Sequence, residues 1–225
     1  MNYYTKYIKY KTKYNNIKNI QSGGYINSIF PDYDNVDKSK LELTDESIYS
    51  VSKINGANFT IEKIIDYLKS NNITITDGTA NVGSDTIMFG LNFEKVNSVE
   101  IDDATYKALK NNVEQYKLKN INVVKGDINN EINNLEQDVI YLDAPWGGRD
   151  YTKFDKLKLY LGNKEILDFV LEHNKKAKLF VLKVPYNYDF EYLENKIKDF
   201  KVLKYPYYNY DKLKYYIILI STITS

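Results

Sequence analysis

The segment Asp143-Ala-Pro-Trp-Gly-Gly-Arg-Asp-Tyr151 combines a carboxylate, a proline and the only tryptophan of the chain. An acceptor side chain followed by proline and an aromatic ring suits methylation of an exocyclic amine on a nucleobase. Such a nitrogen is weakly nucleophilic because its lone pair is delocalised into the ring. Hydrogen bonds from the amine to Asp143 and to a carbonyl near Pro145 would return electron density to it. Trp146 would stack on the base and fix its plane, so we expect Asp143, Pro145 and Trp146 to form a reaction site.

The rest of this loop suits a charged base and its phosphates. A cation over the face of a tryptophan gains about 0.5–2 kcal/mol beyond surface burial, and a methylated guanine is such a cation. The fork of the Arg149 guanidinium, the only arginine, matches phosphate geometry better than lysine does. We therefore expect Trp146, Arg149 and Tyr151 to contact the substrate.

Three further acids, Asp77, Glu100 and Asp127, lie at or just after the end of a predicted strand. The carboxyl ends of parallel strands share one rim of a sheet, where ligands bind. The loop after Asp77 has only two glycines in place of a dinucleotide fingerprint, and its acid would repel phosphate. A nucleoside without phosphate and with cationic groups, S-adenosylmethionine (SAM), fits better.

The acids have separate expected roles toward this cofactor. Glu100 would accept from the ribose hydroxyls, with Asp102 and Asp103 as rivals for that role, and Asp127 would accept from the adenine amine. Any one of these acids alone could instead cap a helix or form a turn. The predicted cofactor-binding residues are Asp77, Thr79, Gly83, Glu100, Ile101, Asp127 and Asp143.

Hydrophobic periodicity supplies the elements that position these residues. It predicts strands at 73–76, 96–101, 121–124, 139–142, 179–184, 202–205 and 215–220 and helices at 60–69, 85–91, 104–116, 164–172 and 188–200. Thr60 is the expected N-cap of the first helix. The alternation indicates an α/β fold with a mostly parallel seven-stranded sheet, one antiparallel strand, and helices on both faces.

Charge and periodicity divide the chain into an N-terminal accessory segment, 1–58, and a main domain, 59–225. The first 20 residues carry five lysines and no acid, which suits either a solvated terminus or contact with phosphates.

Composition excludes several classes of protein. The chain has 225 residues, a net charge of +1, no cysteine and one histidine, so disulfides, thiolate catalysis and Cys/His zinc sites are excluded. We expect no metal, and we expect His173 at the surface. No apolar run is long enough for a membrane span, so we expect a soluble intracellular protein. An AT-rich genome, such as that of a virus, accounts for the excess of Lys, Asn, Ile and Tyr.

The loop at 143–151 resembles the Ser-Pro-Pro-Trp-Gly-Gly-Pro-Asp-Tyr signature of the trimethylguanosine synthases, which methylate the guanine of the RNA cap. Four shorter segments are similar to motifs of that family: Asp77 to Phe89, Lys125-Gly-Asp127, Val184-Pro-Tyr-Asn-Tyr-Asp189 and, upstream, Tyr49-Ser-Val-Ser52, part of a cap-pocket element near 45–52. The resemblance implies a Rossmann-like class I methyltransferase that uses SAM and transfers methyl to the N2 amine of a 7-methylguanosine cap. Capped RNA is the implied partner, and the implied substrate-binding residues are Ser50, Trp146, Arg149, Tyr151 and Asn187.

Some positions depart from the family pattern. Asn81 and Ser84 replace glycines, although asparagine tolerates left-handed backbone. Asp143 replaces a serine and is a stronger, charged acceptor. Tyr186 replaces an arginine expected near the cap phosphates.

Three alternatives stay open at this stage. The first is an amino-methyltransferase for adenine or cytosine in DNA or RNA, because Asp143-Ala-Pro-Trp146 is close to the Asp-Pro-Pro-aromatic motif of those enzymes. The second is a ribose 2′-hydroxyl methyltransferase that uses Lys183 and Asp143 as a base system, although a lysine at a strand end more often extends to solvent. The third is a cap-binding subunit without catalytic activity.

Overall fold

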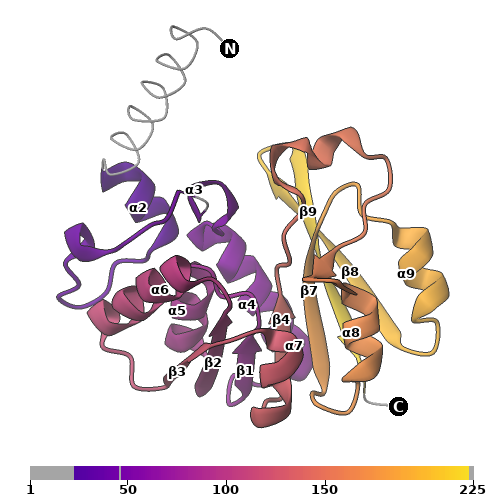
Figure 1. Ribbon diagram of the computed structural model, residues 1–225, viewed down its shortest axis with the longest axis horizontal. Helices are drawn as coiled ribbons and strands as arrows, with labels where there is room; N and C mark the ends of the chain where they lie inside the picture. The colour runs from indigo at the N-terminus through magenta and orange to yellow at the C-terminus, as the bar shows by residue number, and fades with distance from the viewer. Residues whose placement is uncertain (1–22, 46, 223–225) are drawn as a thin grey trace, which may run out of the picture.

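The computed structural model describes residues 23–45 and 47–222, without the side chains of Tyr49 and Arg149. Its centre is a seven-stranded sheet in the order β3-β2-β1-β4-β7-β9-β8 (Figure 1). The strands are β1 (Thr74–Asp77), β2 (Lys95–Glu100), β3 (Ile121–Lys125), β4 (Val139–Leu142), β7 (Leu179–Pro185), β8 (Lys201–Asn209) and β9 (Lys212–Ser221). Only β9 is antiparallel to its neighbours, β7 and β8, which confirms the predicted sheet.

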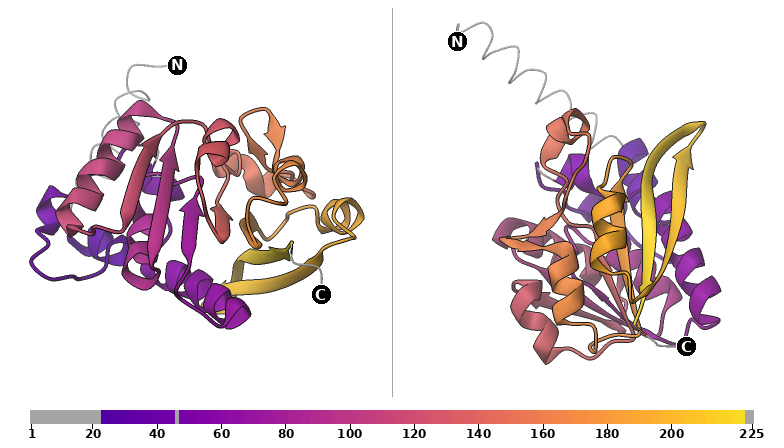
Figure 2. Two further views of the ribbon diagram at one scale, coloured as in Figure 1. Left: turned by 90° about the horizontal axis from the view of Figure 1, so that it is seen from below. Right: turned by 90° about the vertical axis from the view of Figure 1, so that its right-hand side faces the viewer.

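Helices cover both faces of this sheet (Figure 2, left). One face is covered by α4 (Ile54–Leu68), α5 (Ser84–Asn92) and α6 (Asp103–Tyr116), and the other by α7 (Ile128–Glu131), α8 (Ile166–Glu172) and α9 (Phe190–Lys196). The central strands β4 and β7 are buried along their whole length, as strands sandwiched between helices should be. A small hairpin of β5 (Tyr160–Leu161) and β6 (Lys164–Glu165) precedes α8.

The first helix of the main domain begins earlier than predicted. Because α4 begins at Ile54, Thr60 lies inside the helix, and its hydroxyl donates to the Gly56 carbonyl at 3.2 Å. The N-cap prediction for Thr60 is therefore wrong. The helix begins before Thr60 because Ala57, Ile61 and Ile64 form one continuous buried face that extends past the predicted start. The predicted division after residue 58 falls within this helix.

The N-terminal part of the described chain packs on α6. It contains α2 (Gly23–Ile29), the 3-10 turn Lys38–Lys40 and α3 (Ser47–Ser50). The Asn112 amide accepts from the Glu42 backbone N–H at 2.7 Å and donates to its carbonyl at 2.8 Å. The Tyr116 hydroxyl donates to the Pro31 carbonyl at 2.6 Å. The lysine-rich first 20 residues lie outside the described residues.

Two other sequence expectations can be compared with the structure. His173 is only 5% exposed, because it ends α8 and its ring packs on Phe169 at 4.6 Å, so the surface prediction is wrong. In the described part of the chain, no helix is long and apolar enough to cross a membrane.

Candidate active site

The carboxyl ends of β1, β4 and β7 meet at one rim of the sheet. Parallel pairing places Asp77, the last residue of β1, beside Tyr141 of β4, and Leu142 of β4 beside Leu182 of β7. Asp143 directly follows β4, and Lys183 lies on β7 one residue beyond Leu182. The topology therefore brings an acid and a base from neighbouring strands together.

Lys183 and Asp143 form a buried ion pair at this rim. The Lys183 ammonium is 2.6 Å from Asp143 Oδ2, and the two side chains are 8% and 14% exposed. Lys183 also donates to Ser52 Oγ at 2.7 Å. Ser52 donates in turn to Asp85 Oδ2 at 2.5 Å, and the Tyr141 hydroxyl donates to the same oxygen at 3.2 Å. This network links the segment before α4 to the reaction loop.

The expectation that Lys183 extends to solvent is wrong. Burial alone would lower the pKa of its ammonium, but the Asp143 and Asp85 carboxylates outweigh burial and raise that pKa. Burial raises the pKa of Asp143, and the adjacent ammonium opposes this rise. A signal was present in the sequence, since Lys183 is the one charged residue in the otherwise apolar strand Leu179–Pro185. Ser52, Asp85 and Tyr141 carry no such signal, because only the fold brings them to Lys183.

Asp77 is a second buried acid beside this network. It is 1% exposed and accepts from the Thr86 hydroxyl at 2.6 Å. Burial, with the repulsion of the Asp85 carboxylate, raises the pKa of Asp77 to about 8. The rim thus buries three carboxyl groups, of Asp77, Asp85 and Asp143, against the single ammonium of Lys183. An excess of buried negative charge favours a cationic ligand.

The raised pKa of Asp77 predicts how the stability of the ligand-free protein depends on pH. An aspartate has a pKa near 3.9 in the unfolded chain, so this group favours folding most below about pH 4. Its contribution is then lost as the pH rises to about 8. We expect ionisation of Asp77 to lower the melting temperature of the unmodified protein as the pH rises from about 4 to about 8. The melting temperature of the Asp77→Asn variant should fall less over the same range. Asp66→Asn, at an exposed acid on α4, is the control. Parallel pH profiles for Asp77→Asn and the unmodified protein would contradict the assignment.

Glu100 lies against the loop that follows β1. Its carboxylate accepts from the Asn81 backbone N–H at 2.8 Å and from the Asp102 backbone N–H at 2.8 Å. Burial raises its pKa. Asn81 has a φ of 53°, the left-handed conformation that asparagine tolerates. Asp102 instead caps α6, where it accepts from the Thr105 N–H at 2.9 Å.

The other predicted cofactor residues hold the surrounding backbone. Thr79 Oγ1 accepts from the Asp143 N–H at 2.7 Å, which ties the two loops together. Asp127 caps α7 and accepts from the Asn129 N–H at 2.9 Å. Gly83 has a φ of +94°, and a Cβ there would lie 2.8 Å from Leu109, so only glycine fits. Ile101 is 61% exposed and open to a ligand.

Trp146 sits among aromatic rings beyond Asp143. Its ring centroid is 5.2 Å from Tyr151, edge to face, and 6.5 Å from Tyr215. The Lys183 ammonium is 6.0 Å from the same ring. The buried indole N–H of Trp146 makes no hydrogen bond of normal geometry among the described residues, but it lies near enough to the Asp143 carboxylate to lower the pKa of that group. Pro145 is exposed, and Gly147 has a φ of +89°, a left-handed backbone conformation that glycine adopts without strain.

The remaining predicted substrate residues border this loop. Ser50 Oγ accepts from the Asn81 side-chain amide at 2.9 Å. The Asn187 amide donates to the carbonyls of Tyr151, at 2.9 Å, and Phe154, at 2.6 Å, and so holds the loop in place. Its Oδ1 is buried with no partner in the described chain. The Arg149 side chain lies outside the described residues. Across residues 23–45 and 47–222, no group of three or more His, Asp or Glu side chains could hold a metal ion.

Comparisons with known proteins identify the family and the fold of this chain. A family model described as RNA cap guanine-N2 methyltransferase matches residues 72–219. Protein L320 of Acanthamoeba polyphaga mimivirus, which is uncharacterised, is 30% identical over 204 residues, covering 79% of each chain.

Two solved structures are similar in fold. A protein from Porphyromonas gingivalis W83, assigned as a methyltransferase, has a TM-score of 0.68 at 15% identity, over 90% of this chain and 48% of its own. The T. thermophilus 16S rRNA N2 methyltransferase RsmC, in complex with AdoMet and guanosine, has a TM-score of 0.54 at 17% identity, over 73% of this chain and 42% of its own. With the family match over residues 72–219, the chain belongs to the RNA cap guanine-N2 methyltransferase family, within the class I SAM-dependent methyltransferases.

Proposed function

We propose that this protein transfers a methyl group from SAM to the N2 amine of 7-methylguanosine in the cap of an RNA. The observation that carries the proposal is the position of Trp146. It lies in a glycine-flanked loop directly beyond the buried Asp143–Lys183 pair, so a stacking ring and an amine acceptor are three residues apart.

The residues at the rim fit SAM as the cofactor. The cofactor carries a positive sulfur and an ammonium, and the rim buries three carboxyl groups against one lysine. We expect the Glu100 carboxylate to accept hydrogen bonds from the ribose hydroxyls. Thr79 and Gly83 shape the loop that joins β1 to α5 beside it. A cation beside Asp77 would lower its pKa from about 8, so SAM binding at pH 7 should release protons. Calorimetry in buffers of different ionisation enthalpy measures this release, which Asp77→Asn should diminish.

When bound, SAM supplies an electrophilic methyl group on a positively charged sulfur. Asp143 accepts a hydrogen bond from the guanine N2 amine and opposes delocalisation of its lone pair into the ring. Transfer would join the methyl carbon of the cofactor to the amine nitrogen, and the proton that the nitrogen loses would pass to the Asp143 carboxylate and then to solvent. Lys183 keeps the carboxylate ionised and oriented toward the rim. The electron pair of the broken S–C bond would stay on sulfur, so the leaving group would be S-adenosylhomocysteine, whose thioether sulfur is uncharged.

Trp146 accounts for the choice of base. The 7-methyl group makes guanine cationic, and a cation on an indole face adds about 0.5–2 kcal/mol to stacking. Ser50 and Tyr151 would line the same pocket, with Asn187 holding the loop that carries Tyr151. RsmC, a neighbour in fold, is an rRNA N2 methyltransferase whose structure contains guanosine, which is consistent with N2 chemistry on this scaffold.

One observation favours a second candidate, ribose 2′-hydroxyl methylation. Lys183 and Asp143 form the buried lysine–aspartate pair that such a reaction would use to remove the hydroxyl proton. Trp146 favours the cap amine, because a ribose needs no stacking ring beside the acceptor carboxylate.

The test is methyl transfer from radiolabelled SAM to 7-methylguanosine triphosphate, GTP, uncapped RNA and DNA. We expect labelling of the methylated nucleotide and little labelling of GTP. Transfer to uncapped RNA or DNA but not to 7-methylguanosine triphosphate would overturn the proposal in favour of an adenine or cytosine methyltransferase. Tight binding of 7-methylguanosine triphosphate without transfer to any substrate would identify a cap-binding subunit.

A further inference from the structure

We infer that the tip of the β8–β9 hairpin, residues 208–214, binds the single-stranded RNA that follows the cap. This inference rests on the proposed function, because it extends the same site outward. It concerns a surface that makes no contact with the reacting amine.

Strand register places this tip at the rim of the site. Tyr215 of β9 pairs with Pro185, the last residue of β7, and with Tyr207 of β8. Residues 208–214 therefore extend beyond the carboxyl end of β7, where Lys183 and the reaction loop lie. The right view of Figure 2 shows the hairpin, in yellow, projecting past the other strands. In Figure 1 its tip points to the same end of the molecule as α2 and α3.

Aromatic rings in contact lead from the reaction loop to Tyr207 on β8, and two further tyrosines follow at the tip. Trp146 is 6.5 Å from Tyr215, which stacks on Tyr207 at 4.5 Å with 14° between the ring planes. Beyond Tyr207, Tyr208 is 54% exposed and Tyr210 is 94% exposed. Exposed rings of this kind are surfaces on which unpaired bases stack, at about 1–3 kcal/mol per base.

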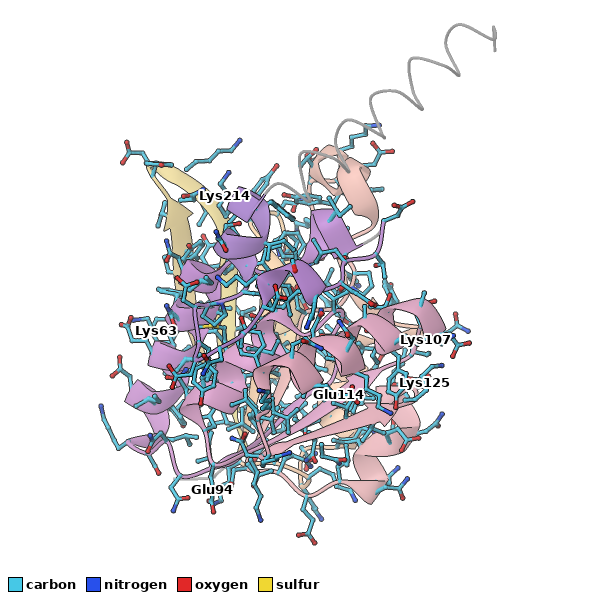
Figure 3. All side chains as sticks on the ribbon, turned by 90° about the vertical axis from the view of Figure 1, so that its left-hand side faces the viewer. Lys63, Glu94, Lys107, Glu114, Lys125 and Lys214 are labelled. Carbon is cyan, nitrogen blue, oxygen red and sulfur yellow. The ribbon has the colours of Figure 1, made fainter. Side chains whose placement is uncertain are left out.

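The charge of the tip matches a nucleic-acid backbone. Lys212 and Lys214 follow the turn at the start of β9, and neither has an ion-pair partner among the described residues. Asp211 is the single acid in residues 201–214. Figure 3 shows Lys214 near the hairpin, at the opposite end of the molecule from Glu94, which precedes β2. Cationic side chains interleaved with exposed tyrosines favour single-stranded RNA over an apolar protein partner.

The experiment uses the full chain and two double variants, Tyr208→Ala/Tyr210→Ala and Lys212→Gln/Lys214→Gln. Binding of a capped 12-nucleotide single-stranded RNA is measured by fluorescence anisotropy, and methyl transfer is measured on that RNA and on 7-methylguanosine triphosphate. We expect the tyrosine variant to weaken RNA binding about tenfold or more. The lysine variant should reduce the slope of log affinity against log salt by about 1. Kinetic constants for the free nucleotide should stay within about twofold, because the tip touches only the chain beyond the cap.

Matched controls are Tyr33→Ala/Tyr160→Ala and Lys175→Gln/Lys198→Gln, which remove exposed side chains outside the tip. RNA affinity equal to the unmodified protein in both tip variants would overturn the inference while leaving the proposed function intact. If the unmodified protein methylates neither substrate, the proposed function fails, and RNA binding alone decides the role of the tip. RNA affinity that falls equally in the tip variants and in the control variants would also overturn the inference about the tip.

Discussion

Replacing Lys183 by methionine is expected to lower the free energy of unfolding by about 3–5 kcal/mol, because it leaves the Asp143 carboxylate buried without its ammonium. Asp143→Ser should have a comparable cost for the opposite reason. The double variant Asp143→Ser/Lys183→Met should lose much less than the sum, because it leaves neither member of the pair buried without its partner, while Asp77 and Asp85 stay in place in all four proteins. Denaturant unfolding of the four proteins gives this cycle.

Catalysis separates the roles of the two residues. Variants without Asp143 should lose about 10²–10³-fold in kcat, because the amine has no carboxylate acceptor. Lys183→Met keeps the acceptor, but the pKa of Asp143 rises further without the ammonium. The rising limb of its kcat–pH profile should therefore move to higher pH, which a purely structural loss would not cause.

Lys178→Met is the matched control for this cycle. Lys178 pairs with Asp138 at 2.8 Å but is 61% exposed, so its removal should cost at most about 1 kcal/mol. An additive cycle at Lys183 and Asp143, or full kcat in the double variant, would contradict the role given to the buried pair.

Trp146→Ala is expected to raise KM for the methylated cap nucleotide by about 5- to 150-fold, the effect of losing about 1–3 kcal/mol of base stacking. SAM affinity, measured by calorimetry, should stay nearly unchanged, because six of the seven predicted cofactor residues lie at or after the ends of β1, β2 and β3, and the seventh, Asp143, is kept in this variant. Trp146→Phe keeps an aromatic face and should recover part of the loss. Equal losses of cap and SAM affinity would show that Trp146, packed on Tyr151 and Tyr215, serves structure alone.

The parts of the fold that follow from local pattern were predictable. The strand at 139–142 was predicted at its observed bounds, because four buried apolar residues end at a polar turn. The start of α4 was not, since helical periodicity before Thr60 is weak and only packing against the sheet sustains it. The strands β8 and β9 are longer than predicted. Their outer residues are exposed and do not alternate clearly between apolar and polar, so the sequence pattern did not identify them as strand.

The residues of the candidate site likewise fall into those that the sequence predicted and those that only the fold brings together. Asp77, Glu100 and Asp143 were predicted to share a rim because the carboxyl ends of parallel strands meet there. The network of Ser52 and Asp85 could not be predicted, since these residues come from distant parts of the chain and meet through Lys183. A lysine within an apolar strand was the available clue.

The most direct test of the central claim is the position of the transferred methyl group. The protein is incubated with SAM and a 7-methylguanosine-capped dinucleotide, the product is digested to nucleosides, and mass spectrometry is compared with synthetic standards. The Trp146–Asp143 arrangement predicts N2,7-dimethylguanosine, formed with one equivalent of S-adenosylhomocysteine for each methyl transferred. A methyl group on a ribose 2′-oxygen, or on the adenine of the second nucleotide, would contradict it.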